Sequence, residues 1–198
     1  MITLVGAGPG SRGSMTLDAV EAVRSADRVV AFPRLKESLE FIRKDIVEIH
    51  RISEVEDAVA EDHLAVVVSG DPLFYGLAAT LKRRGVEIYR VVPGISSMQY
   101  AASKLQIPWH SMAFHSFHGR EVDLDLLLDE KISCVLLDKH YSLTDLSEGL
   151  KEKGAEGLIH GASYLSYENE ILETKSIGES FDLEGDLALG VIELALDE

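Results

Sequence analysis

The sequence predicts an α/β protein with two αβα domains, a parallel first sheet and a mixed second sheet. Short apolar runs alternate with amphipathic stretches along the first half, an order that favours parallel strands covered by helices. A segment around Pro108 and Trp109 then lacks a clear helical period, and the alternation restarts after it. We therefore expect an N-terminal domain over residues 1–110 and a C-terminal domain over residues 111–198.

Five strands and the helices between them are predicted in the first half. Leu17, Val20 and Val23 recur at helical spacing, residues 53–56 have the pattern of a capping box, and a helix over residues 73–84 ends before Gly85. Another helix is expected after Ser96 or Ser97, either of which can cap it. The apolar runs place the strands at residues 3–5, 28–32, 47–50, 65–69 and 88–92.

The second half is expected to form a mixed sheet. Apolar runs predict strands at residues 113–117, 134–137 and 157–160, and a helix capped by Ser142 precedes Gly154. Residues 171–177 and 187–196 have no helix of usual length between them. They are interpreted as adjacent strands, for which antiparallel pairing is an option.

Composition excludes several classes of protein. The 198 residues carry a formal net charge of −15 and no basic stripe, so a nucleic-acid surface is not expected. No apolar run approaches the roughly 18 residues of a membrane span, and no basic segment precedes the first strand as in a secretory signal. The single cysteine, Cys134, excludes a disulfide framework and fits a reducing compartment, so a cytoplasmic protein is expected.

Three predicted strand ends carry glycine and proline together, and ligands of open α/β sheets bind beyond the carboxyl ends of strands. The first is the glycine loop GAGPG at residues 6–10. It resembles a dinucleotide fingerprint, but Ser11 stands where the third glycine should be and the helix begins only near Thr16. The second strand also ends in Ala-Phe-Pro-Arg rather than in an acid that would bind a ribose. A nicotinamide or flavin site is therefore disfavoured.

The other two strand ends are the GDP turn at residues 70–72 and the PGISS turn at residues 93–97. Asp71 and Pro72 could simply begin a helix as its cap and first residue. That interpretation does not explain Gly76 within the first helical turns, where a small residue suggests that something packs close by. Neither turn contains lysine, which excludes a P-loop. A ligand site and simple helix capping both remain open on these residues.

Longer motifs around these turns carry a resemblance that covers nearly the whole chain. GDPLFYG, VVPGISSMQYAASKLQIPW, SFHGR and HGASYLSYENE together resemble the tetrapyrrole methylase superfamily, whose members are S-adenosyl-L-methionine-dependent methyltransferases. SFHGR after Pro-Trp is similar to the group that methylates carbon 5 of a precorrin or cobalt-precorrin in cobalamin (vitamin B12) biosynthesis. GAGPG alone would be weak support.

The resemblance implies that the methyl donor lies in a cleft between the two domains. No catalytic triad is expected, because in-line methyl transfer depends mainly on holding two reactants in place. The implied donor-binding residues are Pro9, Gly70, Asp71, Phe74, Ser96, Ser97, Leu137, Gly161 and Ala188.

The implied acceptor is a tetrapyrrole rich in carboxylates, which an acidic protein must meet with local donors. Arg120 and His118 are the leading candidates, with Arg34 as a further one. Alternatively, Arg120 and His118 brace the domain junction. His110, His115 and His118 have no carboxylate or cysteine placed to complete a metal site.

The resemblance also implies partners and rivals. A homodimer is expected, and the companion activity, which methylates carbon 15 and removes a carboxyl group, is expected on a separate protein because this sequence stops at Glu198. The rivals are a methylase of this fold with another acceptor, such as diphthamide, a non-catalytic nucleotide-binding module, and an oxidoreductase.

Overall fold

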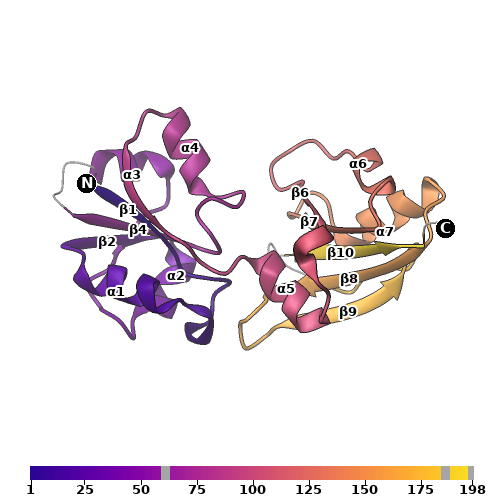
Figure 1. The fold of residues 1–198 in the computed structure, drawn as a ribbon, viewed down its shortest axis with the longest axis horizontal. Helices are drawn as coiled ribbons and strands as arrows, with labels where there is room; N and C mark the ends of the chain where they lie inside the picture. The colour runs from indigo at the N-terminus through magenta and orange to yellow at the C-terminus, as the bar shows by residue number, and fades with distance from the viewer. Residues whose placement is uncertain (59–62, 184–187, 196–198) are drawn as a thin grey trace. The chain divides into compact units, whose positions relative to one another are not determined.

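The chain folds into two compact units, Met1–Ser97 and Met98–Glu198 (Figure 1). The computed structural model describes residues 1–58, 63–183 and 188–195. Helix α5 (Ser97–Leu105) falls in the second unit apart from its first residue, whereas the sequence placed it in the N-terminal domain. Lys104 of this helix forms a 2.7 Å ion pair with Glu170, which ties α5 to a loop of the second unit.

The first unit contains a five-stranded parallel sheet with the strand order β3-β2-β4-β1-β5. Helices cover both of its faces, as the alternating strand and helix order predicts (Figure 1). The strands are β1 (Ile2–Gly6), β2 (Arg28–Ala31), β3 (Val47–Glu48), β4 (Leu64–Val68) and β5 (Ile88–Val92). The helices are α1 (Leu17–Ser25), α2 (Pro33–Leu39), α3 (Ile52–Ala58) and α4 (Leu77–Arg83), with a short 3₁₀ turn, η1, at Arg12–Ser14.

Side chains of the central strands enter two cores, one on each face of the sheet. Leu4 and Val66 pack with Val55 of α3 and Leu81 of α4. The neighbouring residues on the same strands, such as Val5, pack on the other face with α1 and α2. Burial on both faces explains why β1 and β4 are almost continuously apolar.

Several helix ends differ from the sequence prediction. Ser53 lies inside α3, so the predicted capping box is wrong, and the Glu54 carboxylate instead accepts the backbone N–H of His50 at 3.3 Å. Helix α4 begins at Leu77 rather than at residue 73. Gly85 has a φ of +77°, and Arg84 before it closes the helix, which confirms the predicted glycine stop.

The second unit contains a mixed five-stranded sheet with the order β6-β7-β10-β8-β9. β6 and β7 are parallel, and the remaining pairs are antiparallel. The strands are β6 (Ala113–Ser116), β7 (Ile132–Leu136), β8 (Gly157–Ser163), β9 (Ile171–Ser176) and β10 (Ala188–Leu194). The helical elements are η2 (Trp109–Ser111), α6 (Asp125–Leu128) and α7 (Leu143–Glu152).

The two C-terminal strands are not neighbours, so that part of the prediction is wrong. β8 lies between them and pairs antiparallel with both, because the chain turns directly from β8 into β9 and β10 occupies the opposite side of β8. Residues 187 and 196, the predicted ends of the last strand, lie outside the described residues.

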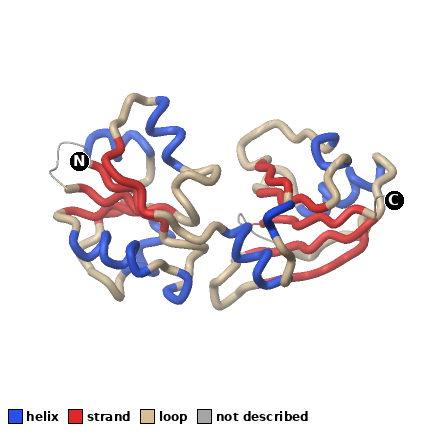
Figure 2. The backbone as a smooth tube through the Cα atoms, viewed as in Figure 1, coloured by secondary structure: helices blue, strands red, loops and turns tan. Residues whose placement is uncertain are grey.

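Helix α7 supplies the main cover of one face of the second sheet. Ser142 caps it as predicted: its hydroxyl accepts the Asp145 N–H at 3.1 Å, and the Asp145 carboxylate accepts the Ser142 N–H at 2.7 Å. Leu146 and Leu150 then pack on Val135 and Ile192 of the sheet. The strands of each unit form one sheet with helices outside it (Figure 2).

Within the described ranges, no helix is long and apolar enough to cross a membrane.

Candidate functional site

Three glycines bring the ends of β1, β4 and β5 into backbone contact. A Cβ atom on Gly6 would lie 2.6 Å from the Gly94 nitrogen and 2.7 Å from the Gly70 oxygen. A Cβ atom on Gly94 would lie 2.2 Å from the same Gly70 oxygen. β4 and β5 flank β1 in the sheet, so the glycine loop, the GDP turn and the PGISS turn meet at one edge.

Hydrogen bonds hold the three turns together. Gly70 donates to the Gly8 oxygen at 2.7 Å, which joins the GDP turn to the glycine loop. The Asp71 carboxylate accepts the Gly94 N–H at 3.1 Å and the Leu73 N–H at 2.7 Å. One carboxylate oxygen therefore joins the GDP turn to the PGISS turn and the other stabilises the GDP turn itself, which makes Asp71 a clamp within the site.

Gly76 has a local explanation that the sequence did not reveal. It lies at the N-cap of α4, and a Cβ atom there would lie 2.4 Å from the Pro72 oxygen. The turn before α4 therefore requires a small residue at this position. Because α4 begins at Leu77, Asp71 and Pro72 lie too far before the helix to be its cap and first residue.

The remaining predicted residues of the first unit lie on the same three turns. Pro9 is buried beside Gly8, whose φ is +73°. Ser96 is also buried, and Ser97 begins α5. Phe74 makes an edge contact with Tyr75 at a ring distance of 5.0 Å.

Backbone strain marks this edge as well. Tyr75 has a φ of +50°, and Tyr164 has the same φ in the loop that follows β8 in the second unit. Bulky residues rarely adopt this conformation, and strained residues of this kind cluster at functional sites. No sequence signal predicts either position, because both are tyrosines rather than glycines.

In the second unit, four strand ends lie at one edge of the sheet. β6, β7 and β8 end there and the antiparallel β10 begins there. Leu137, which is buried, donates its N–H to the Ala188 oxygen at 3.0 Å. The structure therefore brings together Leu137 and Ala188, two of the predicted donor-binding positions.

The SFHGR segment is tied to the loop after β7 at this edge. The Asp138 carboxylate accepts the Gly119 N–H and the His140 N–H, each at 2.8 Å. The bonds from these backbone N–H groups hold the pKa of Asp138 below its ordinary value. The imidazole of His118 lies 3.4 Å from the Leu137 oxygen. His118 thus lies at the same edge as Leu137.

The two predicted arginines lie in exposed positions, one in each unit. Arg120 ends the SFHGR turn, and its N–H donates to the Phe117 oxygen at 3.1 Å. Arg34 is the second residue of α2, directly after the carboxyl end of β2.

Gly161 does not follow a strand, contrary to the sequence prediction. β8 continues to Ser163, so Gly161 lies within it. A Cβ atom there would lie 2.9 Å from Leu143 and 2.9 Å from Phe181, so the packing of α7 and Phe181 accounts for the glycine.

Among the described residues, no three histidine, cysteine or acidic side chains gather as metal ligands.

Comparison with known proteins gives a family match over most of the chain. The family model described as Tetrapyrrole (Corrin/Porphyrin) Methylases matches residues 1–180. A probable cobalt-precorrin-7 C(5)-methyltransferase of Methanocaldococcus jannaschii is 32% identical, with 90% of this chain and 90% of the relative covered. The cobalt-precorrin-7 C(5)-methyltransferase of Salmonella typhimurium is 31% identical, with 86% of this chain and 88% of the relative covered.

A solved structure supports the fold. The uroporphyrin-III C-methyl transferase of Thermus thermophilus, complexed with S-adenyl homocysteine, superposes with a TM-score of 0.79 at 21% identity. The match covers 97% of this chain and 96% of that structure.

Proposed function

Because the chain belongs to the tetrapyrrole methylase family, we propose that it transfers the methyl group of S-adenosyl-L-methionine to carbon 5 of a precorrin or cobalt-precorrin in cobalamin biosynthesis. The observation that carries this proposal is that two relatives above 30% identity are matched over most of their length and both are named for carbon 5. The diphthamide, nucleotide-binding and oxidoreductase alternatives have no comparable support.

The edge of the first unit fits a ligand with amino-acid and adenosine parts. Gly6, Gly70 and Gly94 bring three backbone turns together without side chains of their own, and Ser96 and Ser97 add hydroxyl groups. Backbone groups and hydroxyls suit the carboxylate, amine and ribose of the donor. Asp71 contributes by fixing the GDP and PGISS turns rather than through a free oxygen.

The donor supplies the methyl group of its sulfonium, and the residues of the chain hold the donor in place. Pro9 and Phe74 supply apolar surface for the adenosine, and Leu137 and Ala188, which meet at one edge of the second sheet, are proposed as further donor-binding residues. Methyl transfer to an electron-rich carbon requires in-line alignment, to which a rigid edge contributes by restricting motion. No side chain is assigned as a catalytic base.

Arg120, His118 and Arg34 are proposed to bind carboxylates of the tetrapyrrole. A guanidinium matches a carboxylate with two parallel hydrogen bonds, and both arginines are exposed beyond strand ends. The Arg120→Ala variant is expected to weaken tetrapyrrole binding roughly tenfold while leaving S-adenosylhomocysteine binding intact. Equal losses of both would show that Arg120 has a structural role.

Calorimetry tests the class of ligand. S-adenosylhomocysteine is expected to bind the purified protein, and NAD is not. Incubation with isotopically labelled S-adenosyl-L-methionine and a panel of precorrins, followed by mass spectrometry, then tests transfer. Binding of NAD, or binding of S-adenosylhomocysteine without transfer to any precorrin, would contradict the proposal.

Two finer features are also proposed: a homodimer and a cytoplasmic location. The homodimer is proposed from the resemblance to the family. Light scattering on the purified protein tests the dimer, and a monomer at micromolar concentration would contradict it.

A further inference from the structure

Arg12 lies on a turn that is anchored to the donor-binding edge of the first unit. It begins η1, which follows the glycine loop directly. The Ser14 hydroxyl donates to the Ser11 oxygen at 2.8 Å, and the Ser14 N–H donates to the same oxygen at 3.1 Å. A Cβ atom on Gly8 would lie 2.7 Å from the Ser14 oxygen, so η1 packs against the loop that bridges to Gly70. The backbone of Arg12 is therefore fixed relative to that edge.

The side chain of Arg12 is held by an aromatic ring. Its guanidinium carbon lies 4.4 Å from the centre of the Phe41 ring, and Phe41 is 39% exposed. A guanidinium stacked on a ring keeps the N–H groups along its edge available, which is the geometry that binds a carboxylate with two hydrogen bonds.

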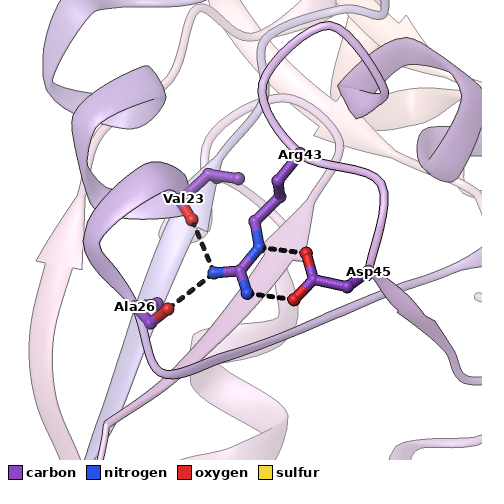
Figure 3. Close-up of polar contacts among 4 residues, drawn as sticks. All are labelled: Val23, Ala26, Arg43 and Asp45. Carbon is purple, nitrogen blue, oxygen red and sulfur yellow. Dashed lines mark hydrogen bonds and ion pairs between the residues drawn. The ribbon is translucent and has the colours of Figure 1, made fainter.

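Arg12 differs in its partners from Arg24, Arg43 and Arg84 of the same unit. Arg24 pairs with Glu21 at 3.0 Å, and Arg84 pairs with Glu56 at 3.0 Å. Arg43 bonds to both oxygens of Asp45 and also donates to the carbonyl oxygens of Val23 and Ala26 (Figure 3). Within the part of the chain that the structure describes, Arg12 has an aromatic contact and no carboxylate partner.

This difference matters in a protein with a formal net charge of −15. Such a protein repels a polyanionic ligand at long range and must attract it through local cations. An arginine placed on a ring, without an acidic neighbour to neutralise it, is one such cation. Its anchored turn lies at the edge where the proposed donor site is built.

We propose that Arg12, oriented by Phe41, binds a carboxylate of the anionic tetrapyrrole substrate. The inference rests on the proposed function and adds a substrate-binding residue to it. Phe41 is a positioning residue that acts through Arg12. The class of ligand is a macrocycle bearing several carboxylates.

The test compares four variants of the full chain. Arg12→Gln removes the charge, Arg12→Lys keeps the charge without the planar group, and Phe41→Leu removes the ring. Arg24→Gln is the matched control, because it removes the same charge from an exposed arginine of the same unit. Fluorescence titration with uroporphyrin, a stable tetrapyrrole rich in carboxylates, measures binding without turnover, and calorimetry with S-adenosylhomocysteine measures the donor site.

Arg12→Gln is expected to weaken uroporphyrin binding roughly tenfold, with Arg12→Lys and Phe41→Leu in between and Arg24→Gln near wild type. In methyl transfer, Arg12→Gln is expected to raise KM for the precorrin with little change in kcat. S-adenosylhomocysteine affinity should stay unchanged throughout.

Two results would overturn the inference. One is an Arg12→Gln variant that loses no more uroporphyrin affinity than Arg24→Gln. The other is an equal loss of tetrapyrrole and S-adenosylhomocysteine binding, which would assign Arg12 to the structure of the loop. The failure of the proposed function has a different signature, namely absence of methyl transfer by a wild-type protein that binds uroporphyrin, and the titration of the variants still tests Arg12 in that case. A wild-type protein that binds no uroporphyrin would overturn the inference as well.

Discussion

The two units assemble their strand-end loops in different ways. In the first unit, Gly6, Gly70 and Gly94 allow three backbones to touch, so the contact is made by main-chain atoms. In the second unit, the loops after β6 and β7 are joined by the Asp138 carboxylate, which accepts backbone N–H groups from Gly119 and His140. The first edge is therefore fixed by main-chain contact together with the Asp71 carboxylate, and the second edge by the Asp138 carboxylate.

The difference predicts how each edge responds to change. Backbone atoms in contact cannot move without moving a strand, whereas a side chain at a crowded position can change its rotamer. Substitutions at the glycines of the first edge should therefore cost more than a substitution at Gly161 of the second unit, whose Cβ atom would meet side-chain atoms. The first unit should also hold its ligand-binding geometry more rigidly.

The largest effect is expected for Gly94→Ala. Its Cβ atom would lie 2.2 Å from the Gly70 oxygen, which only a shift of two turns can relieve. We expect a loss of about 3 kcal/mol in the free energy of unfolding, measured by urea denaturation, together with weaker S-adenosylhomocysteine binding. Gly13→Ala is the control, because a Cβ atom there would meet nothing within 4 Å, and it should change stability by less than about 0.5 kcal/mol. If Gly94→Ala and Gly13→Ala lost the same unfolding free energy, the proposed backbone contact at the first edge would be contradicted.

A smaller effect is expected for Gly161→Ala in the second unit. The Cβ atom would lie 2.9 Å from Leu143 and Phe181, and both contacts are with side-chain atoms that can repack. A loss of about 1 kcal/mol is expected by the same urea measurement. A loss as large as that of Gly94→Ala would show that the second unit is as intolerant as the first.

One carboxylate in each unit, Asp45 in the first and Asp138 in the second, makes the free energy of unfolding depend on pH. Hydrogen bonds from Arg43 lower the pKa of Asp45 from 3.8 to about 2, and backbone N–H groups lower the pKa of Asp138. Each folded-state pKa lies below the unfolded value, so the unfolded chain binds more protons as the pH falls. The stabilisation is present above the unfolded pKa and is lost as the pH falls through the folded pKa.

Urea denaturation over an acid pH series measures this loss. Asp45→Asn and Asp138→Asn should each flatten the fall in stability, Asp45→Asn between pH 3.8 and about 2. A slope identical to that of the wild-type protein would contradict the assigned bonds.

Most of the first unit could be predicted from sequence, because buried parallel strands are short apolar runs with clear ends. Residues 88–92 match β5, and the glycine-rich turns mark the edge of the sheet. No bounds were predicted for helix α2, which has only seven residues. Gly6 and Gly94 were not among the predicted site residues, because only the structure shows that their backbones touch.

The second unit was harder to predict for a physical reason. Which strands pair depends on contacts between distant residues, and the order that places β8 between β9 and β10 leaves no local pattern. The role of Asp138 depends on the same long-range pairing, because Gly119 lies on the neighbouring parallel segment. Gly161 was assigned to a strand end because the apolar run was read as ending at residue 160, whereas β8 continues to Ser163.

The most direct test of the proposed function is to locate the methyl group that the protein transfers. The wild-type protein is incubated with cobalt-precorrin-7 and S-adenosyl-L-methionine labelled with ¹³C in its methyl group, and the product is analysed by carbon NMR. One new labelled methyl group is expected on carbon 5. A label on another ring carbon, or no labelled product from a protein that binds S-adenosylhomocysteine, would contradict the proposed function.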